Sequence, residues 1–271
     1  MNRLKLSCFI IAKNEADRIV RTIRAVKGWV DEIVVVDSGS TDGTQALAEG
    51  EGARVIFNAW PGFGQQKRFG EAQCRNDWVI NLDADEVVSE KLAAEIQTLF
   101  ARGEPALAVY ALPINDVYPG QSKPRLWAND YVQPRLYDRR RVQFKDSTLH
   151  DSLETAGMTV GRLSGDVHHF SSRSLDDQLS KMVERARYNA DHSKRKSAGI
   201  LRFRLVFEFP VSFLRYYVMR RHFAGGLLGF QTSMIGAFSR YARIARMLEA
   251  TERPERAAPR AEALNERSKA P

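Results

Sequence analysis

The sequence predicts an α/β protein in which a mostly parallel β-sheet with helices on both faces is followed by a basic helical region. Three observations support this fold class. Strand-like and helix-like segments alternate through residues 1–105, acidic residues follow three of the strand-like segments, and basic residues gather in the last third of the chain. With 271 residues, of which 44% are apolar and 27% charged, the composition is that of a globular protein rather than a disordered or fibrous one.

Residues 1–105 carry the alternation. Short apolar or β-branched runs predict strands, and apolar residues spaced three or four apart predict helices. The expected order is strand 6–12, a helix with Ile19, Ile23 and Val26 on one face behind an N-cap at Asn14, strand 33–36, helix 44–51, strand 54–57, helix 65–75, strand 78–82, and a helix from Ser89 to Phe100. Strands and helices at this spacing form a parallel sheet, and ligands bind beyond the carboxyl ends of its strands.

Residues 106–175 are expected to form a smaller, partly antiparallel extension. Its strand-like pieces at 107–112, 132–137, 141–144 and 158–163 are separated by prolines and glycines. The first domain is therefore expected to cover residues 1–175, with halves at 1–105 and 106–175.

Residues 176–250 are expected to be helical. Ser174 and Asp177 have the spacing of a variant capping box, which predicts a helix that reaches about residue 193. A second helix is expected over 201–222, with a kink or restart at Pro210, and a third over 227–248. The tail 251–271 has no sustained apolar face, so disorder is expected there.

The basic excess lies entirely in the last third of the chain. The net charge is +8; residues 1–175 carry 22 Lys or Arg and 23 Asp or Glu, whereas residues 176–271 carry 19 and 10. Within 194–246, eleven basic residues are interleaved with ten Phe or Tyr and accompanied by one acid, Glu208. This pattern favours contact with a polyanion, either an anionic membrane surface or nucleic acid.

Other classes are disfavoured by the sequence. Two cysteines cannot form a disulfide framework or a cysteine-based zinc site. Charged residues interrupt every apolar stretch long enough to span a bilayer, and the first residues show no signal-peptide pattern, so a cytoplasmic protein is expected. His168 and His169 lie in a strand-like stretch without a zinc-type spacing, which favours packing or hydrogen bonding over metal ligation.

Acidic residues follow the first, second and fourth predicted strands. Glu15 follows the first, Asp37 the second, and Asp83 and Asp85 the fourth. In an extended chain, Asp83 and Asp85 point to the same side, and their oxygens suit Mg²⁺ or Mn²⁺ shared with a diphosphate. The alternative is that Asp37 and Asp42 form turns and Asp83 caps a helix. Acids at three strand ends favour a shared ligand.

Three segments together resemble the family 2 glycosyltransferases, which have the nucleotide-sugar-binding GT-A fold. They are residues 10–15 (IIAKNE), 34–44 (VVVDSGSTDGT) and 78–86 (WVINLDADE). Within that family the chain is similar to the bacterial β-1,4-glucosyltransferases of lipopolysaccharide core biosynthesis. The motifs cover residues 1–90, and the resemblance over 91–250 is looser.

The resemblance implies roles for the donor-site residues. The segment from Ala12 through Asn14 to Glu15, together with Asp37, would hold the base and ribose of the nucleotide. Asp83 would contact the ribose or the waters of a Mg²⁺ or Mn²⁺ ion, and Asp85 would bind the ion directly. Among the remaining donor-side residues, Lys67 and Arg68 could reach the diphosphate or could equally be solvated helix charges.

The resemblance also implies a carboxylate base that takes the proton of the attacking hydroxyl. His150-Asp151 falls in the right region, so Asp151 is the candidate base, with Glu154 and Asp146 as competitors. His150 and the arginines Arg135 and Arg139 are candidates for binding the acceptor, the arginines through phosphate groups, unless they belong to a solvated edge strand. The Gln-x-x-Arg-Trp signature of processive synthases is absent, which favours transfer of a single sugar.

The resemblance therefore implies a metal-dependent, inverting hexosyltransferase. It would move one hexose, glucose from UDP-glucose, to a lipid-linked lipopolysaccharide inner-core acceptor while bound peripherally to the cytoplasmic face of an anionic inner membrane, without a nucleic-acid partner. One alternative acceptor is a polyprenyl phosphate. A second alternative is a non-enzymatic nucleic-acid-binding module, which would leave the acids at three strand ends unexplained.

Overall fold

The computed structural model describes residues 4–128, 130–148, 151–191, 193 and 196–252. The chain divides into two compact units. The first contains residues 1–117 and 129–171, and the second contains residues 118–128 and 172–271. The loop 118–128 therefore belongs to the second unit although it connects two strands of the first.

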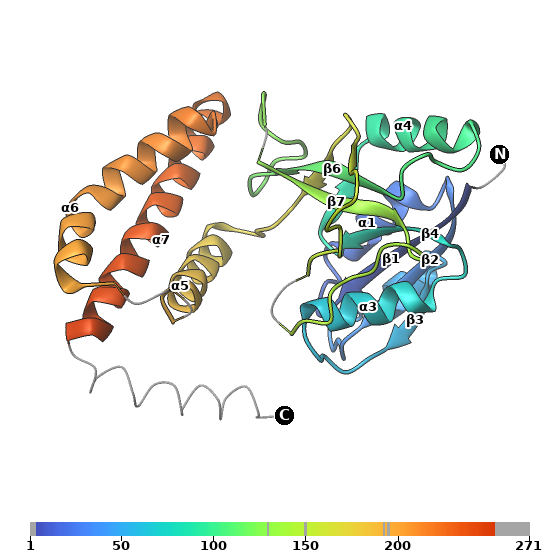
Figure 1. Ribbon diagram of the computed structural model, residues 1–271, viewed down its shortest axis with the longest axis horizontal. Helices are drawn as coiled ribbons and strands as arrows, with labels where there is room; N and C mark the ends of the chain where they lie inside the picture. The colour runs from blue at the N-terminus through green and yellow to red at the C-terminus, as the bar shows by residue number, and fades with distance from the viewer. Residues whose placement is uncertain (1–3, 129, 149–150, 192, 194–195, 253–271) are drawn as a thin grey trace. The chain divides into compact units, whose positions relative to one another are not determined.

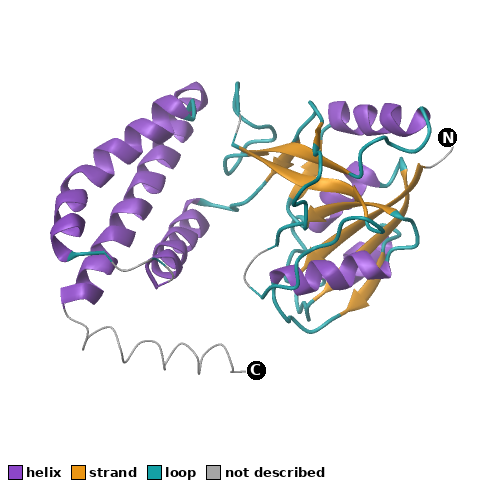
Figure 2. Ribbon diagram, in the orientation of Figure 1, coloured by secondary structure: helices purple, strands orange, loops and turns teal. Residues whose placement is uncertain are grey.

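The first unit is built on one sheet with the strand order β3-β2-β1-β4-β7-β6-β9-β5, and β8 pairs with β6 (Figures 1 and 2). Its strands are β1 Leu4–Ala12, β2 Val30–Asp37, β3 Arg54–Phe57, β4 Trp78–Asp83, β5 Glu86–Val88, β6 Val109–Asp116, β7 Tyr131–Asp138, β8 Gly161–Arg162 and β9 Val167–His169. The four strands β3, β2, β1 and β4 are parallel, whereas β7 runs antiparallel to β4 and β6. The predicted α/β architecture is confirmed.

Helices cover both faces of this sheet. They are α1 Ile19–Val26, α2 Thr44–Gly50, α3 Phe63–Gln73 and α4 Glu90–Ala101. Alternate residues of β1 point to opposite faces, so Leu6 and Ile10 pack with α1, α2 and α4, while Phe9 packs on the other face. On that face, a Cβ on Gly70 of α3 would lie 2.7 Å from the Phe9 ring, so the glycine lets α3 approach the sheet closely.

The second unit is a group of helices. It contains α5 Leu175–Asp191, α6 Ala198–Leu214, a π-helical turn Arg215–Met219, a 3-10 turn His222–Gly225 and α7 Gly226–Glu252. Leu201 and Ile244 join α6 to α7, and Glu208 of α6 pairs with Arg240 of α7. Among the described residues, no helix is long and apolar enough to cross a bilayer.

Loop 118–128 is fixed to the turn between α6 and α7. The Tyr118 hydroxyl lies 2.7 Å from His222 Nδ1, and Arg125 Nη2 donates to the carbonyl of Arg220 at 2.8 Å. These contacts explain why a loop between two strands of the sheet belongs to the helical unit.

Several expected elements are confirmed. Ser89 caps α4 by accepting from Leu92 N, and Ser174 Oγ accepts from Asp177 N at the start of α5. Asp177 in turn accepts from the amide of Arg173, which completes the capping arrangement.

Other expected elements are wrong in detail. Asn14 does not cap α1, because it adopts φ 55° and the helix begins at Ile19. The predicted strand 141–144 is reduced to a bridge between Phe144 and Leu153, and 158–163 contributes only β8. α6 continues through Pro210, so of the two expected outcomes there, a kink or a restart, the restart does not occur. Residues 251 and 252, expected to belong to a disordered tail, are the last two residues of α7. The rest of the expected tail lies outside the described residues.

Candidate active site

The ends of three parallel strands bring the predicted acids to one edge of the sheet. Ala12 at the end of β1 pairs with Asp37 at the end of β2, and Ile11 pairs with Asp83 at the end of β4. Asp37 and Asp83 therefore lie on either side of β1. Neighbouring strands are about 4.8 Å apart, so the two acids are separated by roughly 10 Å across the edge.

Asp83 lies between two buried cations. Its Oδ1 is 2.9 Å from Lys67 Nζ, and its Oδ2 is 3.0 Å from Arg135 Nη2. Burial alone would raise the pKa of Asp83, but Lys67 and Arg135 hold it well below its usual value. The carboxylate is therefore ionised and fixed by two partners.

Arg135 supports the edge from within the sheet. Its guanidinium also donates to Asn81 Oδ1 at 2.6 Å and to Glu86 Oε1 at 2.9 Å. Glu86 Oε2 accepts from the backbone amide of Asp83 at 2.9 Å, and burial raises the pKa of Glu86 to about 7 although Arg135 opposes the shift. Arg135, predicted to bind the acceptor, is 6% exposed and lies within the acid cluster.

Asp85 and His169 lie together beside this cluster. His169 Nε2 is 3.5 Å from Asp85 Oδ1, and His169 Nδ1 is 2.8 Å from Asp116 Oδ1. Burial would lower the pKa of His169, but hydrogen bonds to Asp116 and Asp85 raise it to about 10. The Tyr131 hydroxyl lies 3.1 Å from the same Nδ1. The imidazole is thus held between two carboxylates.

Arg18 connects the end of β1 to Asp85. Its Nε donates to Glu15 Oε2 at 2.7 Å, and its Nη1 donates to Asp85 Oδ2 at 3.3 Å and to the carbonyl of Phe170 at 2.9 Å. The side chain is 4% exposed. Arg18 therefore fixes two predicted site acids to each other.

The first two strand ends are linked by a hydrogen-bonded turn. The amide of Asn14 donates to Ser40 Oγ at 2.8 Å, and Asn14 Oδ1 accepts from Thr41 N at 2.9 Å. Asp37 is fully buried, and its Oδ1 accepts from Ser40 N at 2.9 Å and from Gln45 Nε2 at 2.6 Å. The Asp37 carboxylate therefore stabilises the turn, which is the alternative role that the sequence also allowed for it.

Asp151 reaches the cluster through Lys67. Lys67 Nζ, fully buried in α3, donates to Asp151 Oδ2 at 2.7 Å, and 45% of the Asp151 side chain is exposed. The chain before Asp151 docks on the start of α3, where Phe63 N donates to the carbonyl of Thr148 at 3.2 Å. The candidate base and Asp83 therefore share one ammonium group.

The structure does not bring every predicted residue to this edge. Arg68 donates to the carbonyl of Phe144 and to the side chain of Gln143. Arg139 donates to the carbonyl of Asn76, at the amino end of β4 and so at the opposite edge from Asp83. His150 lies outside the described residues. The competitors Asp146 and Glu154 are exposed.

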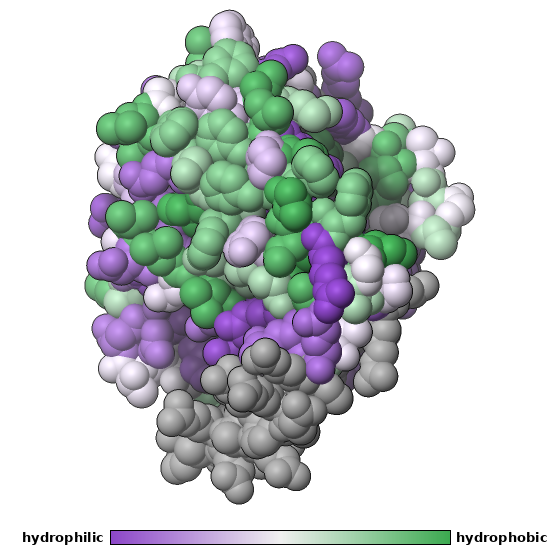
Figure 3. All heavy atoms as spheres, turned by 90° about the vertical axis from the view of Figure 1, so that its left-hand side faces the viewer, coloured by the Kyte–Doolittle hydropathy of each residue, from purple (hydrophilic) through white to green (hydrophobic). Residues whose placement is uncertain are grey.

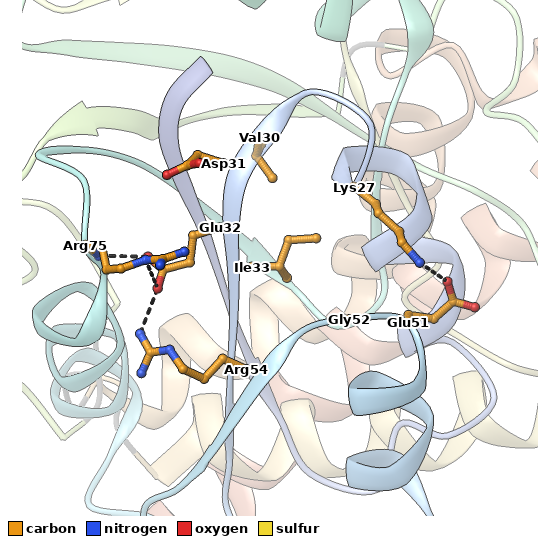
Figure 4. A pocket seen from close by; sticks show the side chains of 9 residues that line it. All are labelled: Lys27, Val30, Asp31, Glu32, Ile33, Glu51, Gly52, Arg54 and Arg75. Atoms are coloured by element: carbon orange, nitrogen blue, oxygen red, sulfur yellow. Dashed lines mark hydrogen bonds and ion pairs between the residues drawn. The ribbon is translucent and has the colours of Figure 1, made fainter. Parts of the chain in front are cut away.

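A charged pocket lies at the start of β2, also at the opposite edge from the acids. Its lining includes Glu32, which pairs with Arg54 and Arg75, and Glu51, which pairs with Lys27 (Figure 4). Glu32 and Glu51 already have cationic partners, and the third carboxylate of the lining, Asp31, accepts a hydrogen bond from Asn76 Nδ2.

The fold and these contacts agree with two comparisons. The sequence profile of Glycosyl transferase family 2 matches residues 7–162, more than half of the chain. An uncharacterized glycosyltransferase of Rickettsia felis is 37% identical over 269 residues, which cover 96% of this chain and 95% of the relative. The chain belongs to glycosyl transferase family 2.

A second relative and a solved structure match this chain over different shares of its length. The lipopolysaccharide core biosynthesis glycosyltransferase LpsC of Rhizobium meliloti is 28% identical over 249 residues, with 87% of this chain and 88% of LpsC covered. Glucosyl-3-phosphoglycerate synthase of Mycobacterium tuberculosis, crystallised with Mn²⁺, UDP and glucosyl-3-phosphoglycerate, matches 43% of this chain and 45% of its own at 25% identity and a TM-score of 0.33.

Family membership confirms the predicted GT-A fold and the predicted enzyme class, a hexosyltransferase. It also replaces the alternative of a non-enzymatic nucleic-acid-binding module. The described residues of this glycosyltransferase contain no group of three or more His, Cys, Asp or Glu arranged to hold a metal ion.

Sequence reasoning missed three residues of the site: Arg18, Asp116 and His169. His169 was expected to pack or to form hydrogen bonds. It does form them, but its partner is the predicted metal ligand Asp85. The signal could not be read locally, because β9 brings His169 opposite Glu86 of the short strand β5, a pairing across 83 positions.

Proposed function

We propose that this glycosyltransferase moves a single hexose, glucose from UDP-glucose, to an inner-core sugar of lipopolysaccharide with inversion at the anomeric carbon. The observation that carries the proposal is the position of Asp83, Asp85 and Asp151 at the carboxyl edge of the sheet. Lys67 joins Asp83 to Asp151 there, and Arg18 joins Asp85 to Glu15. The similarity to LpsC supports the lipopolysaccharide core as acceptor. The choice of glucose rests on the motif resemblance alone.

Donor binding is assigned to the strand ends. Ala12, Asn14 and Glu15 at the end of β1, with the turn shaped by Asp37, line the edge where α/β sheets bind nucleotides. Because the Asp37 carboxylate already accepts several hydrogen bonds, its contribution is to hold this turn. Of the two cations predicted to contact the diphosphate, Lys67 and Arg68, we assign this contact to Lys67, because its Nζ lies at the Asp83 carboxylate. Arg68 instead holds the 143–144 segment.

The donor atoms at Asp85 fit a divalent ion. Asp85 Oδ1 and His169 Nε2 lie 3.5 Å apart, and the other ring nitrogen of His169 is fixed by Asp116. A ligating histidine commonly gives its second N–H to a carboxylate in this way, and Mg²⁺ or Mn²⁺ commonly takes few protein ligands beside phosphate oxygens. Asp85 would therefore hold the ion, joined by His169 Nε2 once the imidazolium has lost the proton on that nitrogen. The ion would supply positive charge that stabilises the departing diphosphate.

Asp151 is assigned the role of base. The acceptor hydroxyl gives its proton to a carboxylate oxygen of Asp151 while its oxygen forms a bond to the anomeric carbon. The bond between that carbon and the diphosphate breaks, and its electron pair leaves with UDP. Lys67 orients Asp151 from the buried side, and the half-exposed carboxylate remains open to the acceptor.

The helical unit is assigned to an anionic membrane surface. Exposed apolar residues recur at three- or four-residue spacing along α6 and into the following turn, at Ile200, Phe203, Phe207, Val211, Leu214 and Val218, and along α7, at Leu227, Phe230, Met234 and Phe238. Figure 3 shows apolar side chains gathered on the surface of this unit. No acidic residue occurs between Glu208 and Glu249, whereas six arginines do. An apolar stripe beside arginines suits an anionic bilayer interface, where a lipid-linked acceptor is found.

The chemistry is tested by UDP release. Purified enzyme is given UDP-glucose, UDP-galactose or UDP-N-acetylglucosamine with deglucosylated lipopolysaccharide core, with and without EDTA. We expect UDP-glucose to be preferred, and EDTA or Asp85→Ala to abolish release. Full activity in EDTA would overturn the metal assignment, and preference for another donor would overturn the choice of glucose.

Membrane contact is tested by sedimentation with vesicles that contain phosphatidylglycerol. The double change Phe203→Ser with Phe207→Ser should reduce sedimentation strongly, because both rings are at least half exposed on α6. Phe57→Ser is the matched control, since this ring is 65% exposed in the first unit. Unchanged sedimentation of the double variant would remove the membrane assignment.

A further inference from the structure

Two exposed aromatic rings lie where the loop after β3 runs into α3, Trp60 in the loop and Phe63 at the first position of the helix. Trp60 is 44% exposed and Phe63 is 51% exposed. Their ring centroids lie 4.8 Å apart at an interplanar angle of 89°, so the rings pack edge to face and form one surface. The loop follows the carboxyl end of β3, which is parallel to β2, and therefore lies at the same edge as the acids.

This loop is held on both sides. Toward the sheet, the amide of Asn58 donates to the carbonyl of Asp37 at 2.9 Å, and its side chain donates to Gln66 Oε1 at 2.6 Å. On the other side, Gly62 adopts φ 139° and approaches Thr148 so closely that a Cβ would lie 2.4 Å from its Cα. The aromatic surface is thus displayed by a fixed backbone rather than by a free loop.

The aromatic surface lies close to the candidate base. Phe63 precedes Lys67 by four residues in α3, so the two side chains share one face of the helix about 6 Å apart along its axis. Lys67 Nζ contacts Asp151 at 2.7 Å, and Phe63 N donates to Thr148, three residues before Asp151. Phe63 and Lys67 of α3 therefore contact the same stretch of chain, at Thr148 and at Asp151.

We propose that Trp60 and Phe63 form a platform on which a sugar ring of the acceptor stacks while its hydroxyl reaches Asp151. The proposal rests on the proposed function, because it names the part of the site that takes the acceptor. A pyranose has faces of C–H groups that pack on aromatic rings and a rim of hydroxyls that form hydrogen bonds. Exposed apolar rings beside a polar cluster match this amphipathic character.

The pair is assigned to the acceptor because the residues around it, Gly62 and Phe63, contact Thr148 in the segment that carries Asp151, whereas the bond to Asp37 is made by Asn58. The residues assigned to the metal ion, Asp85 and His169, are held by other contacts, from Arg18 and Asp116. Stacking of the uracil ring on Trp60 is the competing outcome, and separate kinetics for donor and acceptor distinguish the two.

The test compares Trp60→Ala, Trp60→Phe and the control Trp127→Ala. Trp127 is 58% exposed and belongs to the second unit, so its loss removes an exposed indole that is not part of the platform. We expect Trp60→Ala to raise the KM for the lipid acceptor about ten-fold, the scale of a lost aromatic anchor, and to leave the KM for UDP-glucose within about two-fold. Trp60→Phe should recover most of the affinity, and Trp127→Ala should bind both substrates as the unchanged enzyme does when the acceptor is presented in detergent.

An unchanged acceptor KM in Trp60→Ala would overturn the platform while transfer by the unchanged enzyme still supported the proposed function. A parallel rise in the KM for UDP-glucose would instead assign the pair to the donor. If the unchanged enzyme transferred no sugar, the proposed function would fail. The platform would then be tested by the binding of an oligosaccharide instead of by kinetics. Lipid-free core oligosaccharide should then alter tryptophan fluorescence of the unchanged protein but not of Trp60→Phe; equal responses would overturn the proposal.

Discussion

Replacement of Arg135 by methionine tests whether the acid cluster is held by this one buried guanidinium. The side chain is 6% exposed and bonds to Asn81, Asp83 and Glu86, of which Glu86 is 1% exposed. Methionine keeps much of the volume but removes the charge. Removal of one partner of a buried ion pair typically costs about 3 to 5 kcal/mol, because the other charge is left unpaired. This is between about a fifth and the whole of the roughly 5 to 15 kcal/mol that stabilises an ordinary domain.

The assay is urea unfolding followed by tryptophan fluorescence, with Arg140→Met as the control. Arg140 follows the same strand and pairs with Asp77, Glu104 and the buried Asp138, but half of its side chain is exposed. Asp138 keeps the hydrogen bond from the amide of residue 140 in the variant, so the loss should lower the free energy of unfolding less than at Arg135. Addition of Glu86→Gln to Arg135→Met should recover part of the loss, because it removes the unpaired carboxylate. Equal losses for the two arginine variants would refute the reasoning.

Three further changes have defined outcomes. Burial raises the pKa of Glu71 to about 7, so its contribution to stability is present below about pH 4.5 and is lost as the pH rises through 7; urea unfolding should show a loss of at most about 3 kcal/mol over this window that Glu71→Gln lacks, and parallel profiles would contradict it. Gly62→Ala should lower both stability and turnover, because its Cβ would collide with Thr148 in a backbone of φ 139°, and a fully active variant would count against the fixed loop. Lys67→Met should lower kcat about a hundred-fold by freeing Asp151, and retention of kcat would remove that assignment.

The sequence was sufficient to predict the parallel half of the sheet. β1, β2 and β4 contain the apolar runs 8–12, 33–36 and 78–80, as expected of strands that are covered on both faces. Asp37 and Asp83 are the last residues of β2 and β4. Their shared edge follows from parallel pairing alone. For this reason the local sequence pattern was enough to predict that these two acids lie at the same edge of the sheet.

The remaining part of the site depends on pairings across long sequence separations. His169 meets Asp85 only because β9 pairs with β5, a three-residue strand without a recognisable pattern. The sequence suggested that Arg135 lies on a solvent-exposed edge strand. Its strand, β7, instead lies between β4 and β6, and the guanidinium contacts Asp83. Local sequence cannot distinguish a buried arginine from a solvated one when its partners lie about fifty residues away.

Calorimetric titration with UDP, in Mn²⁺ and in EDTA, tests the central claim most directly. The account predicts that Mn²⁺ strengthens UDP binding to the unchanged protein, that Asp85→Asn removes the increment, and that Asp77→Asn, at the amino end of β4, keeps it. Equal affinity for UDP in Mn²⁺ and in EDTA, or an increment that survives in Asp85→Asn, would contradict the assignment of this edge of the sheet to a metal-bound nucleoside diphosphate.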